Sequence, residues 1–213
     1  MNRGSAEIED VYKILAKEFA AHRAPVVDLI EAQTRDQFKV LVATILSART
    51  LDETTTAASL RLFERAKKTQ ELRKLTEKEI EKLIFPVGFY RTKAKHLKQL
   101  PAVLEKEFGG EIPQDVDELT KLPGVGRKTA NLVVAVAFKK PAVCVDIHVH
   151  RIFNRLGYIK TKTPLETEME LRRTFPKKFW TTFNSYFVSF GQNTCRPVNP
   201  KCDKCPISRY CSA

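Results

Sequence analysis

Long apolar runs are absent from this 213-residue sequence, and no stretch approaches the about 20 apolar residues that a membrane-spanning helix requires. The opening residues MNRGSAEIED contain no apolar core of the kind that a secretory leader carries. Repeats, linkers and low-complexity segments are missing as well. Because 43% of the residues are hydrophobic, the chain can form one sizeable core or two small lobes. We therefore expect a folded cytoplasmic protein without a membrane partner.

Acidic residues are few, since 25 Asp and Glu stand against 37 Lys and Arg, which gives a formal net charge of +12. Lysine and arginine that neutralise phosphates release condensed counterions, so this imbalance favours a polyanionic partner. Net charge alone does not distinguish DNA from RNA or from an acidic membrane, and a solvated basic surface is the alternative interpretation.

Cysteine is nearly absent outside the C-terminal tail, where Cys195, Cys202, Cys205 and Cys211 form the pattern C-x6-C-x2-C-x5-C. The isolated Cys144 is expected to be a small buried apolar residue. Disulfides explain the cluster poorly, because close cysteine pairs gain little from loop closure. Four thiols with no nearby histidine indicate a metal site. Zinc sites usually pair two C-x2-C motifs and this tail has one, so the spacing leaves zinc and a 4Fe-4S cluster both open.

Helical periodicity dominates the rest of the chain. An apolar stripe begins at Ser5 and ends before Pro25, and Asp36 is the predicted N-cap of a helix that runs to about Ser47. Pro164 is expected in the first helical position of a later helix. Capping boxes are predicted at Thr76 with Glu79, Asp115 with Glu118, and Thr163 with Glu166. The fold class predicted from these patterns is all-α, with two lobes.

Three further segments refine this prediction. In VCVDIHVHRIFNRL an alternating start gives way to helical spacing, so we expect extended chain through Val145 and a helix capped by Asp146. The segment KTANLVVAVAF is apolar nearly all round and predicts a buried helix. Another apolar helix face is formed by Phe179, Phe183, Phe187 and Phe190.

The stretch KLPGVGRKTA raises three possibilities. A Walker A loop needs glycines where Arg127 and Leu122 stand, and a dinucleotide fingerprint needs one at Thr129, so both fail. A helix-hairpin-helix remains, with VDELTKL as its first helix, PGVG as the hairpin and RKTANLVVAVAF as its second helix. There Gly124 and Gly126 let the backbone approach a phosphate. The competing interpretation is an ordinary turn between helices.

Lys128 falls in the first turn of the second helix, where the helix dipole disfavours a positive charge. Either it is a solvated or phosphate-contacting lysine, or the dipole, Arg127 and partial burial lower its pKa and make it a nucleophile. Asp146 lies 18 residues further on, after a helix and a reversal that could return the chain to the same end. A carboxylate opposite an amine suits cleavage of an N-glycosidic bond.

Five motifs give the sequence a specific resemblance: LSARTLD, VGFYRTKAKHL, LPGVGRKTAN, VDIHVHRI and the four-cysteine tail. Over essentially the whole chain it resembles the endonuclease III family of the helix-hairpin-helix DNA glycosylase superfamily. The resemblance implies a six-helix barrel lobe at 29–140, with the hairpin motif at about 115–138. It implies a second, iron-sulfur cluster lobe made of 1–28 and 141–213, with the DNA cleft and active site between the lobes.

The function implied by the resemblance is that of a bifunctional DNA glycosylase and AP lyase of base excision repair. Such an enzyme excises oxidised pyrimidines and cleaves the strand 3′ to the abasic site by β-elimination. Lys128 would be the Schiff-base nucleophile and Asp146 its catalytic partner, and the four tail cysteines would hold a 4Fe-4S cluster. The expected partner is double-stranded DNA that contains a damaged base or abasic site, bound by a monomer in a prokaryotic cytoplasm. The alternatives are a monofunctional mismatch glycosylase and a non-catalytic DNA-binding protein with a structural metal site.

The resemblance also implies further DNA contacts. Phe89 matches an apolar wedge, although it could equally be a buried core aromatic. Arg49 stands where the family typically has a Gln that fills the gap left by the flipped base, so the preference for the opposite base is open. Asp52 fits the family pattern, and either it or His148 could simply satisfy local hydrogen bonds. The full predicted set of DNA contacts is Arg49, Phe89, Leu122, Gly124, Val125, Gly126, Arg127, Thr129, His148, Arg196 and Lys201.

Overall fold

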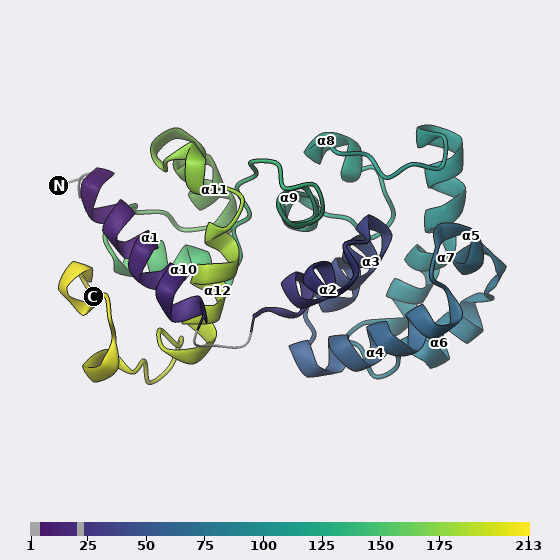
Figure 1. Ribbon diagram of the computed structural model, residues 1–213, viewed down its shortest axis with the longest axis horizontal. Coiled ribbons are helices and arrows are strands. Elements are labelled where there is room, and N and C mark those ends of the chain that lie inside the picture. The colour runs from purple at the N-terminus through teal and green to yellow at the C-terminus, as the bar shows by residue number, and fades with distance from the viewer. Residues whose placement is uncertain (1–4, 21–23) are drawn as a thin grey trace. The chain divides into compact units, whose positions relative to one another are not determined.

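The computed structural model describes residues 5–20 and 24–213, and every regular element in these ranges is a helix (Figure 1). The all-α prediction is therefore confirmed. No helix in the described part is both long and apolar enough to cross a membrane. The elements are α1 Ser5–Ala20, α2 Val26–Thr34, α3 Gln37–Ser47, α4 Asp52–Arg65, α5 Thr69–Lys74, α6 Glu77–Ile84, α7 Tyr90–Phe108, α8 Val116–Leu119, α9 Arg127–Ala137, α10 Ile147–Arg155, α11 Pro164–Thr174, η1 Lys177–Phe179, α12 Phe183–Asn193, η2 Cys202–Lys204 and η3 Ser208–Tyr210.

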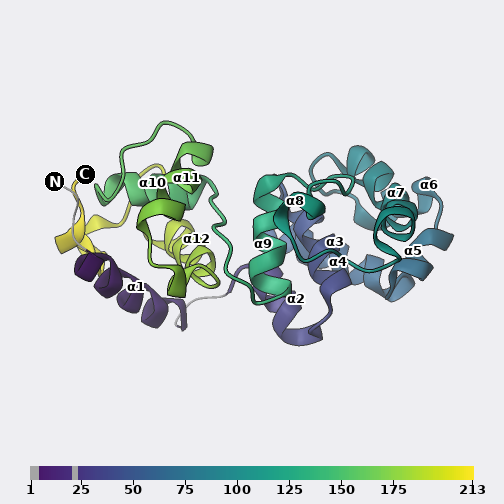
Figure 2. The ribbon, with the colours of Figure 1, turned by 90° about the horizontal axis from the view of Figure 1, so that it is seen from above.

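Two compact units make up the chain. The first unit combines Met1–Pro25 with Pro141–Ala213, and the second unit is Val26–Lys140. Within the first unit, α1 packs beside α12 although the whole second unit separates them in sequence, as Figure 2 also shows. Each unit has its own buried core, which the clustering of apolar side chains makes evident.

The core of the first unit is rich in aromatic rings. Phe153 of α10 stacks on Phe187 of α12 with 4.6 Å between ring centroids and 12° between planes. The predicted face of four phenylalanines is buried as expected, but it is not one helix. Phe179 ends η1, while the other three lie on α12. Residues 180–182 form a break between the two elements. The periodicity did not reveal this break, because the spacing of the phenylalanines continues across it.

In the second unit, α3 is the central helix. It is buried from Phe38 to Leu46 apart from Lys39, and it packs against α2, α4, α7 and α9. The second helix of the predicted hairpin, α9, is buried at Ala130, at Asn131 and from Val133 to Val136, as its apolar composition indicated. The hairpin region is thereby fixed to the centre of this unit.

The predicted helix starts are found with small differences. Asp36 caps α3 through its carboxylate, and the Thr76 box is complete, with both reciprocal bonds present. Asp115 caps α8 through its own carboxylate. Thr163 accepts a bond from the Glu166 amide, but the Glu166 carboxylate accepts from the backbone amide of Lys162 rather than from that of Thr163. Pro164 occupies the first helical position, as predicted.

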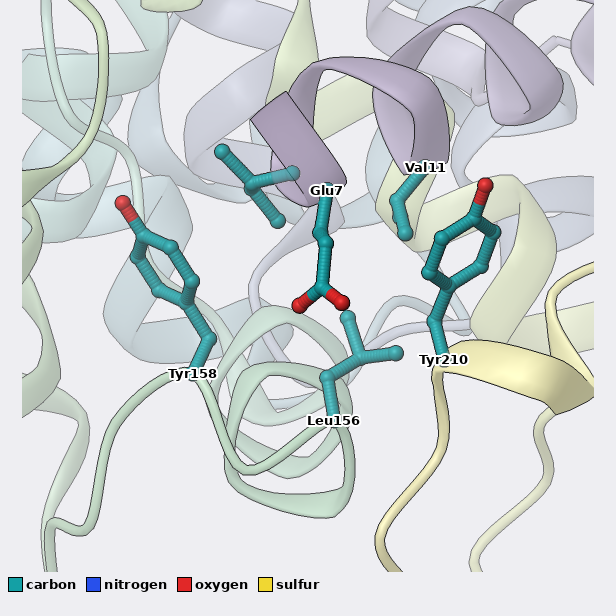
Figure 3. Close-up of a pocket in the computed structure, with 6 residues that line it drawn as sticks. Glu7, Val11, Leu156, Tyr158 and Tyr210 are labelled. Carbon is teal, nitrogen blue, oxygen red and sulfur yellow. The ribbon is translucent and has the colours of Figure 1, made fainter. Parts of the chain in front are cut away.

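A small cavity lies beneath α1 in the first unit (Figure 3). Its volume is about 10 Å³, close to the room that one water molecule requires. It is lined by Glu7, Ile8, Val11, Leu156, Tyr158 and Tyr210, none of which is a predicted site residue. We assign it to imperfect packing between α1 and the segment that follows α10.

Candidate functional site

The hairpin between α8 and α9 is a tight turn fixed by one glycine. Gly124 has a φ of +79°, a conformation that L side chains rarely adopt. A Cβ added to it would also lie 2.8 Å from Nδ1 of His96 on α7. The first helix of the motif is shorter than VDELTKL predicted, because α8 spans only Val116–Leu119. A 3-10-like turn continues from it, in which the Leu122 amide donates to the Leu119 carbonyl.

Gly126 is a glycine for a different reason. Its φ of −87° suits any residue, and a Cβ added there would meet no atom within 4 Å. It is the N-cap of α9 and supplies no side-chain cap to the first amides of the helix. Leu122 and Val125 are buried, so their side chains anchor the hairpin, whereas Gly124 and Gly126 are exposed. Thr129 is half-buried in the first turn of α9.

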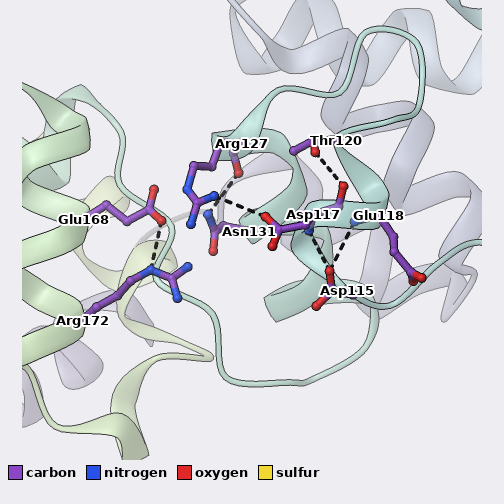
Figure 4. A network of polar contacts seen from close by, with 8 residues as sticks. All are labelled: Asp115, Asp117, Glu118, Thr120, Arg127, Asn131, Glu168 and Arg172. Carbon is purple, nitrogen blue, oxygen red and sulfur yellow. Dashed lines mark hydrogen bonds and ion pairs between the residues drawn. The ribbon is translucent and has the colours of Figure 1, made fainter.

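Arg127 ties the start of α9 to α8 (Figure 4). Its Nη1 lies 3.4 Å from Oδ1 of Asp117, and its carbonyl accepts a 3.0 Å bond from the Asn131 side chain. Asp115 accepts from the amides of Asp117 and Glu118 and so caps α8. An ion pair this exposed contributes less than about 1 kcal/mol, but it orients the guanidinium beside the hairpin.

Lys128 is the second residue of α9 and lies in its first turn, as predicted. The side chain is exposed, so the partial burial that was expected to help activate it is absent. Lys128 lies in the first turn of α9, ahead of the buried positions of this helix, which begin at Ala130. An exposed amine at a helix N-terminus is accessible to a bound strand.

Asp146 belongs to the first unit and is the N-cap of α10, as the sequence predicted. Its Oδ1 accepts from the amides of His148 at 2.9 Å and Val149 at 2.8 Å. The residue is buried. The two amide bonds hold the carboxylate in one orientation at the N-terminus of α10.

Helix α10 also grips the start of the cysteine tail. Arg151 donates to the carbonyls of Cys195 at 2.7 Å and Gly191 at 3.1 Å, and it contacts Nδ1 of His148 at 3.0 Å. Burial lowers the pKa of Arg151. His148 packs so closely on Gly191 that a Cβ there would lie 2.6 Å from its ring nitrogen. His148 therefore fills a structural position next to the capped end of α10.

Arg155, one turn further along α10, contacts the cysteine tail directly. It donates to Sγ of Cys195 at 3.3 Å and to the carbonyl of Arg196 at 2.8 Å. The sequence analysis missed both arginines. Their spacing of four residues places them on one helix face, but a pair of arginines at this spacing on a polar helix is usually solvated, so the pattern gave no separate signal.

The four tail cysteines line one cavity of about 300 Å³, together with Arg155 and Lys201. All four are free thiols, which agrees with the argument against disulfides. Burial raises the pKa of the Cys205 thiol, and the nearby thiols of Cys195, Cys211 and Cys202 add to this effect. The predicted apolar role of Cys144 is consistent with its complete burial.

The donor set of this cavity fits a soft metal group. Four sulfur atoms without histidine or carboxylate suit zinc or an iron-sulfur cluster. In the described part of the chain, no three His, Cys, Asp or Glu side chains converge tightly enough to share one metal ion. Arg196 and Lys201 are exposed on the loop that links Cys195 to Cys202.

Arg49 and Phe89 are exposed neighbours in the second unit. The Phe89 side chain is 62% exposed, which excludes the buried-core alternative for this residue. The guanidinium carbon of Arg49 lies 5.5 Å from the centre of the Phe89 ring. Asp52 instead accepts a 3.3 Å bond from the amide of Val26, the first residue of α2, and so has a structural task.

A family model for HhH-GPD superfamily base excision DNA repair proteins matches residues 42–177, well over half of the chain. The chain belongs to this superfamily. The matched range contains the hairpin, Lys128 and Asp146 and stops before the cysteine tail.

Similar proteins support this membership. Endonuclease III of Thermotoga maritima is 48% identical over 83% of this chain and 83% of its own length. Endonuclease III of Bacillus subtilis is 40% identical over 82% of this chain and 80% of its length. An endonuclease III-like protein 1 from Gallus gallus is 42% identical, and the match spans 63% of that longer protein.

Solved structures extend the likeness to the whole chain. A trapped covalent intermediate of endonuclease III with DNA matches 99% of this chain at 36% identity, with a TM-score of 0.87. A thermostable thymine-DNA glycosylase matches 97% of this chain at 26% identity, with a TM-score of 0.86. The fold expected from the resemblance is thereby confirmed as that of endonuclease III.

Proposed function

We propose that this protein is a bifunctional DNA glycosylase and AP lyase that excises oxidised pyrimidines from duplex DNA and then cleaves the strand. The observation that carries the proposal is Lys128, an exposed amine in the first turn of the hairpin's second helix, in a member of a base excision repair superfamily. The likeness to a trapped covalent complex of endonuclease III with DNA supports it.

Lys128 and Asp146 divide the chemistry. The Asp146 carboxylate stabilises the oxocarbenium-like sugar while the bond between C1′ and the base breaks and the base departs with the electron pair. The Lys128 amine bonds to C1′ and, after the sugar ring opens, forms an iminium ion. The iminium makes the C2′ proton acidic. Its loss expels the 3′ phosphate, and the strand is cut by β-elimination.

The hairpin holds the DNA backbone. Backbone amides at Gly124 and at the uncapped start of α9 are suited to a phosphate, because a helix N-terminus favours anions. The open space at Gly126 is consistent with this role, since no atom of the described residues lies within 4 Å of a Cβ placed there. Arg127 adds a charge beside the same turn. Contacts of this kind position the strand without reading its sequence.

The four tail cysteines hold a 4Fe-4S cluster in this proposal, which is supported by the four thiols that line one cavity and by the likeness of the chain to endonuclease III. When bound, the cluster would supply structural cross-linking of the tail rather than acid–base chemistry. Arg155 and Arg151 anchor the tail to α10, and the exposed Arg196 and Lys201 are available to phosphates. Iron and acid-labile sulfide in about equal amounts are the expected analysis. A colourless preparation with one zinc and no iron would contradict it.

The proposed lyase step is tested by reduction. Borohydride added to the protein and an abasic duplex should trap a covalent complex, and Lys128→Gln should abolish trapping while duplex binding persists. Lys121→Gln, a change of an exposed lysine in the same hairpin region, is the matched control and should trap normally. Covalent trapping that survives Lys128→Gln would reject Lys128 as the nucleophile.

A monofunctional mismatch glycosylase is the second candidate, favoured by the likeness to the thymine-DNA glycosylase. Such an enzyme uses water and needs no amine at position 128. A panel of duplexes that carry oxidised pyrimidines or mismatches, scored for base release and for strand cleavage, separates the two. Release of a mismatched base without strand cleavage would favour the second candidate.

A further inference from the structure

Two exposed residues of the second unit have strained backbones and contact each other. Arg49 lies in the turn between α3 and α4 with a φ of +53°, and Phe89 precedes α7 with a φ of +57°. Neither is a glycine, and bulky residues adopt this region only where the surrounding structure enforces it. Their side chains meet as a cation–π pair at 5.5 Å. Such strain concentrates where a protein presents groups to a ligand.

Lys93 of α7 is hydrogen-bonded to the turn that contains Arg49. It is only 7% exposed. Its Nζ donates to the carbonyl of Leu46 at 2.7 Å, to the carbonyl of Ala48 at 2.6 Å and to Oγ1 of Thr50 at 3.2 Å. The three acceptors flank Arg49 on both sides and use all three protons of the ammonium group. Burial lowers the pKa of Lys93 to about 8.

The turn before Phe89 is joined to the turn of Arg49 through Oγ1 of Thr50. The amide of Gly88 donates to Oγ1 of Thr50 at 3.2 Å, so Thr50 receives bonds from Lys93 and from the residue before Phe89. A Cβ added to Gly88 would lie 2.5 Å from the carbonyl oxygen of Arg49. The two backbones are therefore in contact directly beneath the exposed pair.

We propose that Lys93 is a positioning residue that locks Arg49 and Phe89 into one stacked element. The entry of these two residues into duplex DNA, where a nucleotide has been extruded, is the role that the family resemblance already implies for them. The proposal rests on the proposed function. Phe89 replaces the lost stacking, as apolar wedges do in other DNA-bending proteins. The guanidinium, which carries only donors, faces acceptor atoms of the unpaired partner base.

Helix α7 carries a second lysine, Lys98, that bonds carbonyls at the end of another helix and serves for comparison. Lys98 of α7 donates to the carbonyls of Arg73 at 2.9 Å and Leu75 at 2.7 Å, at the end of α5. It thus satisfies carbonyls at a helix C-terminus, as Lys93 does for Leu46 and Ala48. Neither of its acceptors flanks a residue with positive φ. Lys98→Met is therefore a control for the loss of a capping ammonium on the same helix, although Lys98 is only half-buried.

The test compares two substrates. A duplex with an oxidised pyrimidine needs the wedge, because the extruded nucleotide leaves a gap in the stack. A single-stranded abasic oligonucleotide has no partner strand and needs only the lyase chemistry. Lys93→Met should lower single-turnover base excision from the duplex at least about tenfold and leave single-strand cleavage within about twofold. Lys98→Met should leave both rates within about twofold, and thermal melting should show that both variants fold.

A double-mutant cycle asks whether Lys93 acts through the wedge. Phe89→Ala alone should slow duplex excision, and Lys93→Met should cost less in that background than it does alone, because one of the two side chains that it positions is already missing. Gly88→Ala, which separates the two turns without removing any charge, should reproduce the duplex defect.

Four results would count against the proposal. Fully additive effects of Lys93→Met and Phe89→Ala would overturn it, as would an equal loss on single-stranded abasic DNA. Normal duplex excision by Lys93→Met in an otherwise active enzyme would reject it while leaving the proposed function intact. If the unchanged protein acted on neither the damaged duplex nor the single-stranded abasic oligonucleotide, the proposed function would be wrong, and so would the role of Lys93 that depends on it.

Discussion

At the scale of single residues, Asp146 performs two tasks that its substitutions separate. Its carboxylate caps α10 with bonds to two amides, and in the proposed mechanism its charge stabilises the developing sugar cation. Asn caps helices about as well as Asp but carries no charge. The choice of substitution therefore decides which task is lost.

Asp146→Asn should leave the free energy of unfolding within about 1 kcal/mol of the unchanged protein and reduce the rate of base excision at least about 100-fold. Denaturant unfolding and single-turnover excision check the two parts. Asp36→Asn is the control, since Asp36 caps α3 through two amides in the same way. Should Asp146→Asn excise bases at the normal rate, the charge of Asp146 would have no part in the reaction.

Local signals made such residues predictable. The caps at Asp36, Thr76 and Asp146 were found because cap and helix are adjacent in sequence. Lys93 was not found, since its acceptors are 43 to 47 residues away and the segment KAKHL looks like a solvated helix face. Arg155 was missed for the same reason, because its partners lie about 40 residues further along the chain.

At the scale of elements, the hairpin shows how two neighbouring glycines serve different purposes. Gly124 is required by its positive φ and by His96 of α7. Gly126 is required by nothing within the described protein, which leaves a close approach from outside as the reason for a glycine. Helix α7 supports both regions of the second unit that are proposed to contact DNA, through His96 beside Gly124 of the hairpin and through Lys93 beside the turn of Arg49.

Gly126→Ala should leave the free energy of unfolding within about 0.5 kcal/mol, or raise it slightly, because Ala restricts the unfolded chain and fits the native φ. The affinity for an abasic duplex should fall about tenfold, since a methyl group would obstruct the phosphate. Gly124→Ala should instead destabilise the protein by more than about 1 kcal/mol. Melting curves and fluorescence anisotropy measure the two effects. If Gly126→Ala bound the abasic duplex as tightly as the unchanged protein, the proposed contact between this turn and a phosphate would be wrong.

At the scale of the whole molecule, the net charge of +12 becomes a statement about binding. Composition indicated a polyanionic partner but not which lysines and arginines contact it. The fold divides them into groups with structural partners, such as Lys93, Lys98, Arg151 and Arg155, and groups exposed near the proposed contacts. The composition could not make this division, because it depends on tertiary hydrogen bonds.

The exposed pair on the cysteine loop provides the test at this scale. The logarithm of the binding constant for a non-cleavable abasic duplex should fall linearly with the logarithm of salt concentration between about 50 and 200 mM. Arg196→Gln and Lys201→Gln should each weaken binding and reduce the slope by about one, because each removes one phosphate contact. Lys78→Gln, on an exposed lysine of α6 paired with Glu81, should leave the slope unchanged. If Arg196→Gln and Lys201→Gln both gave the slope of the unchanged protein, the cysteine loop would not contact the DNA backbone, and the proposed cluster would serve only to hold the tail on α10.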